Sequence, residues 1–305
     1  MAKVVEYVRQ TLPQLKAIDR KTTVALMSVS PIEVHGPHLP VGTDVYISDE
    51  LQRRYIEEIG RRHPEFTLLR LPPLYVGADP LPAVGSIAVP APVLEGLLLA
   101  FARGLASQGF RYLLISDNHG GPRHQLAIEA AARKAWQKHR FYLINPFGLE
   151  FRMMVQHDPA LMQATGLGPG SIGDDPDVHA GTNETSLVLA TDAGLVDPGY
   201  KGVPASRPTR GPGIVAGIGR LVSALGGRTV GKDLEHLDAT LAWTGAKDFV
   251  PYMGEPAKAS QEAGEAMYRA RVAVAMDLLD RALQGQRLTV EPMLWGVRFL
   301  RKLPG

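Results

Sequence analysis

The segment 30–44 gathers four side chains that could bind a metal ion or carry protons. They are two carboxylates and two imidazoles: Glu33, His35, His38 and Asp44. Five glycines and prolines interrupt the segment, so a regular helix or a central strand is not expected there. Carboxylate and imidazole groups are ligands that divalent metal ions accept. The segment therefore predicts a metal site on a stiff loop or, as the simpler alternative, a polar surface loop without chemistry.

The spacing within this segment favours a shared site. Glu33 and His35 are two residues apart, so in an extended segment both side chains leave the same face. Asp44 lies beyond a turn and can fold back toward them. Its two carboxylate oxygens could bridge two ions about 3.5–4 Å apart, as in two-metal hydrolytic sites. Two further polar clusters lie far along the chain, at residues 117–122 and 174–186.

Those later clusters add candidates, each with a simpler alternative. His119 stands on a turn whose two following glycines let backbone and substrate approach closely. His179 could bind a metal or pass protons to a leaving nitrogen, or it could be an ordinary hydrogen-bonded loop histidine. Glu184 could be a ligand, or a first-turn glutamate stabilised by the helix dipole. His236 stands among charged residues and is expected to be solvated.

The elements around these clusters predict a mostly parallel α/β sheet. Short apolar runs are expected to be strands, at residues 22–29, 66–71, 111–116 and 141–144. Helical patterns separate them, at residues 48–60, 93–107 and 122–135. This alternation implies right-handed βαβ units, in which ligands bind beyond the carboxyl ends of the strands. The loops that hold His35 and His119 both follow such ends, which supports one shared site.

The remaining segments carry weaker patterns. Residues 4–17 predict an amphipathic helix, and residues 255–283 predict a long helix with a break near Gly264. Another helix is expected to begin near Glu184. Residues 201–229 are rich in glycine and poorly periodic, so they predict irregular structure, with a hairpin as the alternative.

Length and composition exclude several classes of protein. The 305 residues, 45% hydrophobic and 21% charged, predict a single globular domain over residues 1–305. A net charge of +2 with interspersed signs gives no electrostatic case for nucleic acid. The lack of cysteine excludes disulfides, thiolate metal sites and cysteine nucleophiles. We expect a cytoplasmic protein without a membrane partner, because the sequence lacks a long apolar run and its first residues lack a signal-peptide core.

The polar clusters, taken in order, resemble the creatininase (creatinine amidohydrolase) family. Residues 33–44, Glu-Val-His-Gly-Pro-His-Leu-Pro-Val-Gly-Thr-Asp, resemble its first metal motif. Residues 118–121, Asn-His-Gly-Gly, resemble its Asn-Gly-His-Gly-Gly-Asn loop. Two later segments also resemble the family pattern, His-Ala-Gly-Thr-Asn-Glu-Thr-Ser at 179–186 and Gly-Glu-Pro at 254–256.

The resemblance implies a three-layer α/β/α sandwich around a mostly parallel sheet, and a homo-oligomer, often a hexamer. It implies one or two divalent ions per subunit: zinc, manganese or iron. Carried over by position, Glu33, His35, Asp44 and His119 would be metal ligands, with Asp44 as the bridge. His179 would be the catalytic histidine. The implied reaction is hydrolysis of a non-peptide C–N bond in a small-molecule amide, such as a lactam, by metal-activated water.

Two departures from the family pattern bear on the substrate. Members that act on creatinine carry a second-metal glutamate where this chain has Gly121. Either Glu184, which we also consider for a catalytic role, supplies that ligand or the second site is weak. Those members also carry a tryptophan before the catalytic histidine, where this chain has acidic residues: Asp174, Asp175 and Asp177.

These departures argue against creatinine as the substrate, and the acidic residues suggest a substrate with a cationic or hydrogen-bond-donating group. The alternatives within the same fold are a formamide deformylase, a peptidase and a lactonase. The alternative from another class is a non-catalytic metal-binding oligomer, which would bind metal without hydrolysing amides.

Overall fold

A five-stranded parallel sheet lies at the centre of the computed structural model, with the strand order β1-β3-β2-β4-β5. The strands are β1 Lys3–Glu6, β2 Thr23–Ser28, β3 Thr67–Arg70, β4 Tyr112–Ser116 and β5 Tyr142–Ile144. The structure describes residues 2–156, 158–167, 177, 179–207 and 213–302. No helix among them is long and apolar enough to cross a membrane.

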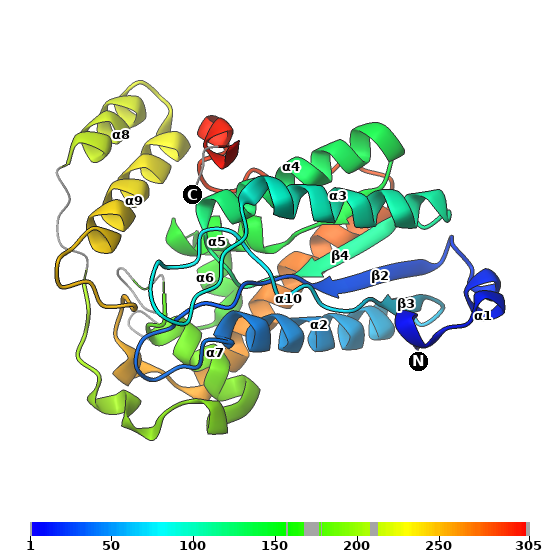
Figure 1. Cartoon of the computed structure of the whole chain (residues 1–305), viewed down its shortest axis with the longest axis horizontal. Helices are drawn as coiled ribbons and strands as arrows, with labels where there is room; N and C mark the ends of the chain where they lie inside the picture. Colours follow the sequence, from blue (N-terminus) through cyan, green and yellow to red (C-terminus); the bar gives the residue numbers. More distant parts are fainter. Residues whose placement is uncertain (1, 157, 168–176, 178, 208–212, 303–305) are drawn as a thin grey trace.

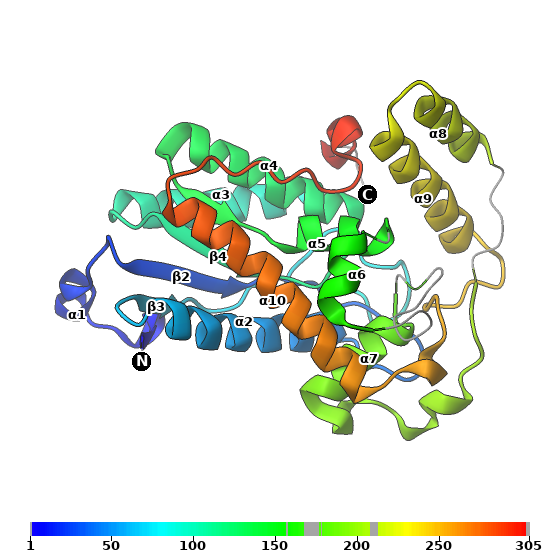
Figure 2. The ribbon, with the colours of Figure 1, turned by 180° about the vertical axis from the view of Figure 1, so that it is seen from behind.

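Helices cover both faces of this sheet, so the predicted three-layer α/β/α architecture is confirmed (Figures 1 and 2). On one face pack α2 Thr43–Arg62, α7 Thr182–Asp192 and α10 Gln261–Leu283. On the other face pack α3 Ala91–Ser107 and α4 Pro122–His139. Each layer thus buries the apolar stripe of its helices against one side of the strands.

Strand β2 shows why the central strands are continuous apolar runs. Its side chains alternate between the two faces of the sheet. Val24 and Leu26 enter the core under α2 and α10, whereas Ala25 and Met27 enter the core under α3 and α4. Because helices cover both faces, neither set of positions can be polar.

The sheet register places the two predicted site loops side by side. Ser28, the last residue of β2, pairs with Ser116, the last residue of β4. The chain after Ser28 enters the loop of Glu33 and His35, and the chain after Ser116 enters the loop of His119. The expectation that both loops lie at the carboxyl end of the sheet is therefore confirmed.

The first two predicted helices, over residues 4–17 and 48–60, begin at other residues in the structure. Residues 3–6 form β1, which pairs with β3, and the helix α1 covers only Leu12–Ala17. The strand that β1 pairs with, β3, lies far along the chain. The pattern of residues 4–17 alone therefore could not show that residues 3–6 form a strand. Helix α2 begins at Thr43 rather than near residue 48, which places Asp44 in its first turn.

The helix predicted over residues 255–283 is broken at residues 259–260, between the 3-10 turn Pro256–Lys258 and α10, and not at Gly264, through which α10 runs without interruption. Gly264 instead marks a close helix contact. A Cβ atom at this position would lie 2.0 Å from the carbonyl oxygen of Ser186 in α7. The glycine therefore lets two helices of the same layer approach each other.

The described part of residues 201–229 is not mainly irregular, as predicted, but contains α8 Ile214–Ala224 and the first two residues of α9 Arg228–Thr244. Gly219 lies where these helices cross, since a Cβ atom on it would lie 2.7 Å from the carbonyl oxygen of Gly231. The α8–α9 hairpin stands apart from the three layers, beyond the carboxyl ends of the strands (Figures 1 and 2). Two shorter helices, α5 Phe147–Val155 and α6 Pro159–Thr165, lie between it and the sheet.

Candidate active site

Carboxylates and imidazoles from four segments meet at the carboxyl end of the sheet. The structure brings together all the predicted site residues: Glu33, His35, Asp44, His119, His179 and Glu184. The loops after β2 and β4, the first turn of α2, and the start of α7 supply them. All are buried except Glu184, whose side chain is 14% exposed. Their ligand atoms form overlapping groups of three, with distances below 4.8 Å within each group.

The first group consists of Glu33, Asp44 and His119. The Nδ1 atom of His119 lies 2.8 Å from Oε2 of Glu33 and 3.4 Å from Oδ2 of Asp44. Its other ring nitrogen, Nε2, lies 2.9 Å from the carbonyl oxygen of Ala78 and can donate a proton there. That bond leaves the Nδ1 lone pair directed at the carboxylates, as a metal ligand requires.

The second group consists of His35, Asp44 and Glu184. The Nε2 atom of His35 lies 3.6 Å from Oδ1 of Asp44 and 3.5 Å from Oε2 of Glu184. Nδ1 of the same ring lies 2.9 Å from the carbonyl oxygen of Glu33, so a proton on Nδ1 leaves the Nε2 lone pair available. Asp44 belongs to both groups and presents a different oxygen to each.

The ligand atoms of these two groups are left in a state that suits the binding of divalent cations. Within the described residues, some of the buried cluster atoms have no hydrogen-bond partner: Glu33 Oε2, Asp44 Oδ2 and His35 Nε2. Such atoms are rare in folded proteins unless a ligand satisfies them. Burial alone would lower the pKa of His35, but the carboxylates of Asp44 and Glu184 raise it well above its ordinary value. The cluster therefore has an excess of negative charge that positive ions would balance.

Asn118 and Arg271 hold the carboxylates in place. The Nδ2 atom of Asn118 donates to Oδ1 of Asp44 at 3.0 Å and to Oε1 of Glu184 at 2.8 Å. Arg271, a buried residue of α10, donates to Oδ1 of Asn118 at 2.7 Å and to Glu150 at 2.8 Å. The arginine thus fixes which way the amide points. The sequence analysis missed Arg271, although an arginine at a position facing the core of a helical pattern was a usable signal.

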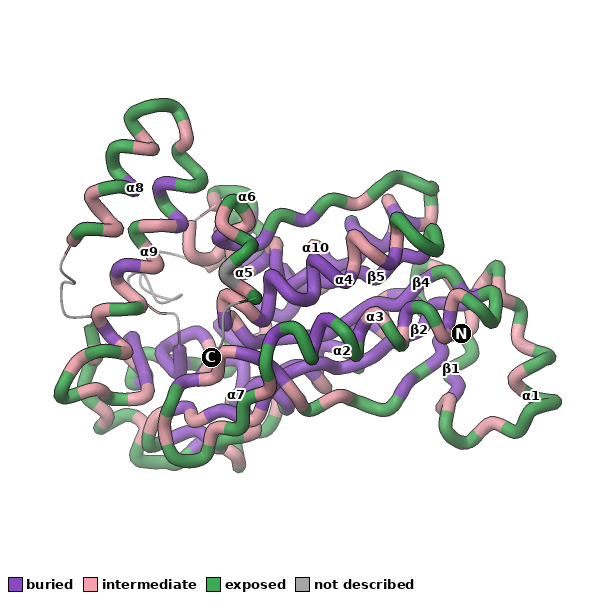
Figure 3. Tube along the Cα trace, turned by 45° about the horizontal axis from the view of Figure 1, so that its top comes forward, coloured by how far each residue is buried: buried purple, intermediate pink, exposed green. Residues whose placement is uncertain are grey.

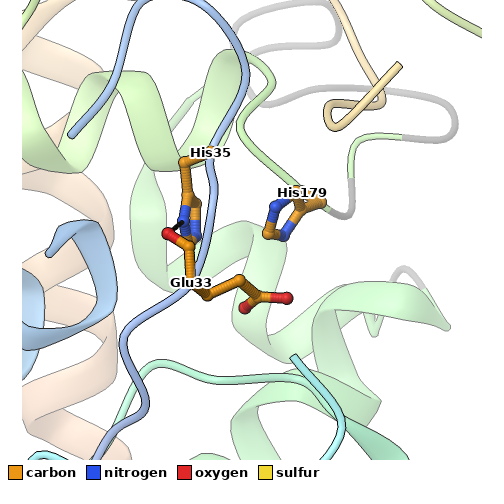
Figure 4. A group of neighbouring side chains, drawn as sticks. All are labelled: Glu33, His35 and His179. Atoms are coloured by element: carbon orange, nitrogen blue, oxygen red, sulfur yellow. Dashed lines mark hydrogen bonds between the residues drawn. The ribbon is translucent and has the colours of Figure 1, made fainter. Parts of the chain in front are cut away.

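His179 forms a third group, with Glu33 and His35 (Figure 4). Its Nε2 atom lies 2.8 Å from the carbonyl oxygen of Val34, and its ring packs between those of His35 and Trp243, at centroid distances of 4.1 and 5.8 Å. Burial, and then the charge of His35, lowers the pKa of His179. The ring is therefore suited to the neutral state, with Nδ1 able to accept a proton.

The simpler alternatives for His179 and Glu184 turn out to be compatible with the functional ones. His179 is a hydrogen-bonded histidine and also a neighbour of the cluster. Glu184 lies in the first turn of α7, where its Oε2 accepts a bond from the backbone nitrogen of Ala180 at 2.6 Å. The same carboxylate contacts His35 and Asn118. Both residues therefore have structural contacts that also fix their position.

Two other polar residues of the sequence analysis have structural roles. His38 is outside the groups found among the described residues, and its Nε2 lies 2.9 Å from Oγ1 of Thr185. Asp177 accepts hydrogen bonds from the backbone nitrogens of Thr182 and Asn183, so it stabilises the start of α7 rather than displaying a free charge. The neighbouring residues 174 and 175 lie outside the described part of the chain.

The position of His119 explains why residue 121 is a glycine. A Cβ atom on Gly121 would lie 2.2 Å from Nε2 of His119 and 2.8 Å from the carbonyl oxygen of Ala78. A side chain there would disrupt the bond that orients His119. Glu184 instead supplies the carboxylate of the second group, from a different element of the fold.

A cavity of about 220 Å³ opens over the polar cluster. Its walls are mainly apolar side chains of α5, α6 and α9. His236 of α9 also lines it, with its ring 6.1 Å from that of Phe151. The prediction that His236 is solvated is therefore wrong. Its neighbours in sequence are charged, but the residues it packs against come from elsewhere in the chain.

Comparison with known proteins assigns the chain to a family. The family model described as "Creatininase: Creatinine amidohydrolase" matches residues 9–279. This chain belongs to the creatininase family. The resemblance stated from the polar motifs is therefore confirmed, and with it membership in a family of hydrolases.

Solved creatininase structures share the fold. A manganese form of creatininase has a TM-score of 0.64 and 23% identity, covering 92% of this chain and 99% of that chain. A Zn–Zn form of a glutamate-to-glutamine mutant of creatininase has a TM-score of 0.63 and 20% identity, with the same coverage. At these identities the likeness shows the fold alone.

One curated relative carries a different activity in its name. It is the mycofactocin precursor peptide peptidase of Mycolicibacterium smegmatis, 28% identical over 170 residues. The match covers 54% of this chain and 57% of that protein, so it spans little more than half of the relative.

Proposed function

We propose that this creatininase-family protein is a metal-dependent amidohydrolase that cleaves an amide C–N bond with water. The observation that carries the proposal is the position of Asp44, which offers one carboxylate oxygen to each of two ligand groups. Glu33 and His119 complete one group, and His35 and Glu184 complete the other. This donor set would hold a pair of zinc or manganese ions. Creatininase structures with manganese and with zinc support that choice.

The chemistry divides between the ions and the protein. When bound, the ions supply Lewis acidity, which polarises the amide carbonyl and lowers the pKa of water. His179 accepts the proton of the attacking water at Nδ1 and returns it to the leaving nitrogen. Its other ring nitrogen is tied to the carbonyl oxygen of Val34, and Trp243 packs on its ring, so the accepting atom is held in one place. Asn118 keeps the carboxylates in their orientation.

A non-peptide amide, such as a lactam or a formamide, is the first candidate for the bond that is cleaved. A peptide bond is the second candidate, and two observations favour it. The cavity above the cluster is larger than a small cyclic amide needs, and a relative is named as a peptide peptidase. Creatinine is not proposed, because Gly121 and the apolar walls change the surroundings of the reacting bond.

Metal content per subunit, measured by mass spectrometry, tests the proposed centre. We expect about two ions in the wild type, about one in Glu184→Gln, and less than one in Asp44→Ala. Asp49→Ala is the matched control, because Asp49 lies on the same helix and accepts a bond from Tyr75 outside the cluster. Wild-type protein that binds no ion after refilling with zinc or manganese would exclude the mechanism, and one ion would indicate a mononuclear hydrolase.

The substrate class is tested with the metal-loaded protein on lactams, formamides and short peptides. Cleavage of lactams or formamides supports the first candidate, and cleavage of peptides alone supports the second. Bound metal without hydrolysis across the whole panel would instead favour a non-catalytic metal-binding protein.

A further inference from the structure

Much of the cavity wall comes from three helices, α5, α6 and α9, that contribute nothing to the polar cluster. One wall consists of apolar side chains of α5 and α6: Phe147, Phe151, Leu161 and Met162. The facing wall is one side of α9, which presents His236, Thr240 and Trp243 at the spacing of successive helical turns. The cavity is thus an apolar space above a polar floor.

These walls reach the polar cluster directly. The ring of Phe151 packs on the backbone beside His119, since a Cβ atom on Gly120 would lie 2.7 Å from that ring. On the other side, the ring of Trp243 lies 5.8 Å from that of His179. A substrate whose amide lies over the cluster must therefore place its neighbouring groups against aromatic surface.

His236 adds one polar group to these walls. Among the described residues, none forms a hydrogen bond with either of its ring nitrogens, and its ring contact is with Phe151. A half-buried imidazole in apolar surroundings is costly unless a ligand or water supplies a hydrogen bond. The residue therefore indicates where a polar atom of a bound molecule would lie.

We propose that the cavity binds an amide carrying one bulky apolar group, aromatic or branched aliphatic, and that His236 forms a hydrogen bond with a polar atom of that ligand. The volume of about 220 Å³ exceeds the roughly 150 Å³ of an engineered apolar cavity that holds benzene, so a six-membered ring fits. A cationic group is disfavoured beside α5, α6 and α9, because the side chains of these helices that line the cavity include no carboxylate to replace its lost hydration. Only the claim that the bound amide is cleaved rests on the proposed function.

Binding of simple amides to the metal-loaded full chain tests this specificity without requiring turnover. The probes are benzamide and cyclohexanecarboxamide, compared with acetamide and 6-aminohexanamide, by calorimetry or ligand-observed NMR. We expect the two apolar amides to bind at least about tenfold more tightly than the other two, because they bury a ring against the walls. Equal affinities, or a preference for the cationic amide, would overturn the proposal.

A cavity-filling variant locates the binding. Thr240→Phe places a ring inside the cavity and should abolish benzamide binding while metal content stays unchanged. Leu241→Phe is the matched control: it adds a ring at the next residue of α9, where the leucine is 55% exposed, and should bind benzamide normally. If Thr240→Phe does not fold, Met162→Trp fills the space from the opposite wall. Benzamide binding that survives filling would place it outside the cavity and overturn the proposal.

The role of His236 is tested with two ligands that differ in polarity. His236→Phe keeps a ring but removes both nitrogens, so benzamide should bind about three- to tenfold more weakly, whereas toluene should bind equally or better. Unchanged benzamide affinity would overturn the assignment of His236. Apolar amides that bind but are never hydrolysed would contradict the proposed function alone, and hydrolysis without apolar preference would contradict this inference alone.

Discussion

The polar floor of the cavity and its apolar walls are built from different parts of the fold. The floor comes from loops and first helical turns at the carboxyl end of the parallel sheet, and its ligand residues are buried or nearly so. The α9 wall comes from a hairpin outside the three layers, where exposed and half-exposed positions dominate (Figure 3). This arrangement lets the walls, and with them the substrate, change while the sheet keeps the metal ligands in place.

The two regions also differ in how their side chains are held. Floor atoms are fixed by hydrogen bonds that continue into the core, from Asp44 to Asn118 and on to Arg271. Wall side chains such as Phe151 and Trp243 are held mainly by packing against neighbouring rings. Changes in the floor should therefore alter chemistry and stability, whereas changes in the walls should alter mainly binding.

Removing the imidazole of His179 should have the largest effect on activity. We expect His179→Ala to lower kcat about 10²- to 10⁴-fold, since a positioned proton carrier is lost. Metal content should stay normal, because neither of the two groups that share Asp44 includes His179. Steady-state kinetics and metal analysis on one preparation measure both quantities.

His38→Gln is the control for this variant, since the glutamine can keep a hydrogen bond to Thr185. It should retain both the metal and most of the activity. Loss of an ion in His179→Ala would show that the histidine is a ligand rather than a proton carrier, and would move it from the chemistry to the metal centre.

Replacing Arg271 tests whether the polar floor depends on the buried residues beneath it. Arg271→Met leaves Glu150 buried without its charged partner, and we expect the free energy of unfolding to fall by about 3–5 kcal/mol in urea titrations. The matched control is Arg269→Met, an exposed position on the same helix, which should change it by less than about 0.5 kcal/mol. Equal effects of the two variants would refute the supporting role of Arg271.

The floor could be predicted from the sequence because its residues lie at strand ends. A buried strand such as 111–116 is visible as an apolar run, and in a parallel sheet its carboxyl end marks the ligand site. Glu33, His35 and His119 follow from that rule together with their side-chain types. The exact start of α2 was missed, because Thr43 begins a helix inside a segment rich in glycine and proline.

The walls could not be predicted, because they depend on packing between distant segments. The glycines of residues 201–229 suggested irregular structure, yet one of them, Gly219, lets α8 approach α9 closely at Gly231. His236 was misjudged for the same reason, since its charged sequence neighbours do not line the cavity and Phe151 does. Local patterns describe what a residue's neighbours in sequence are, not what it packs against.

Lowering the pH should reduce the free energy of unfolding through His236, a residue of the α9 wall. Burial lowers the pKa of His236 to about 4, whereas an unfolded histidine titrates near 6.5. Between these values the unfolded chain binds a proton that the folded chain does not, so stability falls as the pH decreases from 6.5 to 4. The loss should be about 2 kcal/mol, since the ring is only partly buried. His236→Phe should remove this part of the pH dependence, measured by urea unfolding at several pH values.

The control is His139→Phe, at the exposed end of α4, which should leave the pH dependence unchanged. If the difference in stability between the wild type and His236→Phe does not vary with pH, His236 is already solvated in the folded protein. That outcome would also remove the reason to expect a ligand atom beside it.

Substitutions on the exposed face of α8 should have the smallest effect on the free energy of unfolding. Ile218 and Leu221 are 52% and 61% exposed, so Leu221→Ala removes little buried surface and should change the free energy of unfolding by less than about 0.5 kcal/mol. Leu98→Ala in α3 is the matched substitution at a fully buried leucine, where about 2–5 kcal/mol is expected. A comparable loss in Leu221→Ala, accompanied by a smaller particle in sedimentation, would mean that this face is covered by another subunit in solution and that the hairpin belongs to a buried interface.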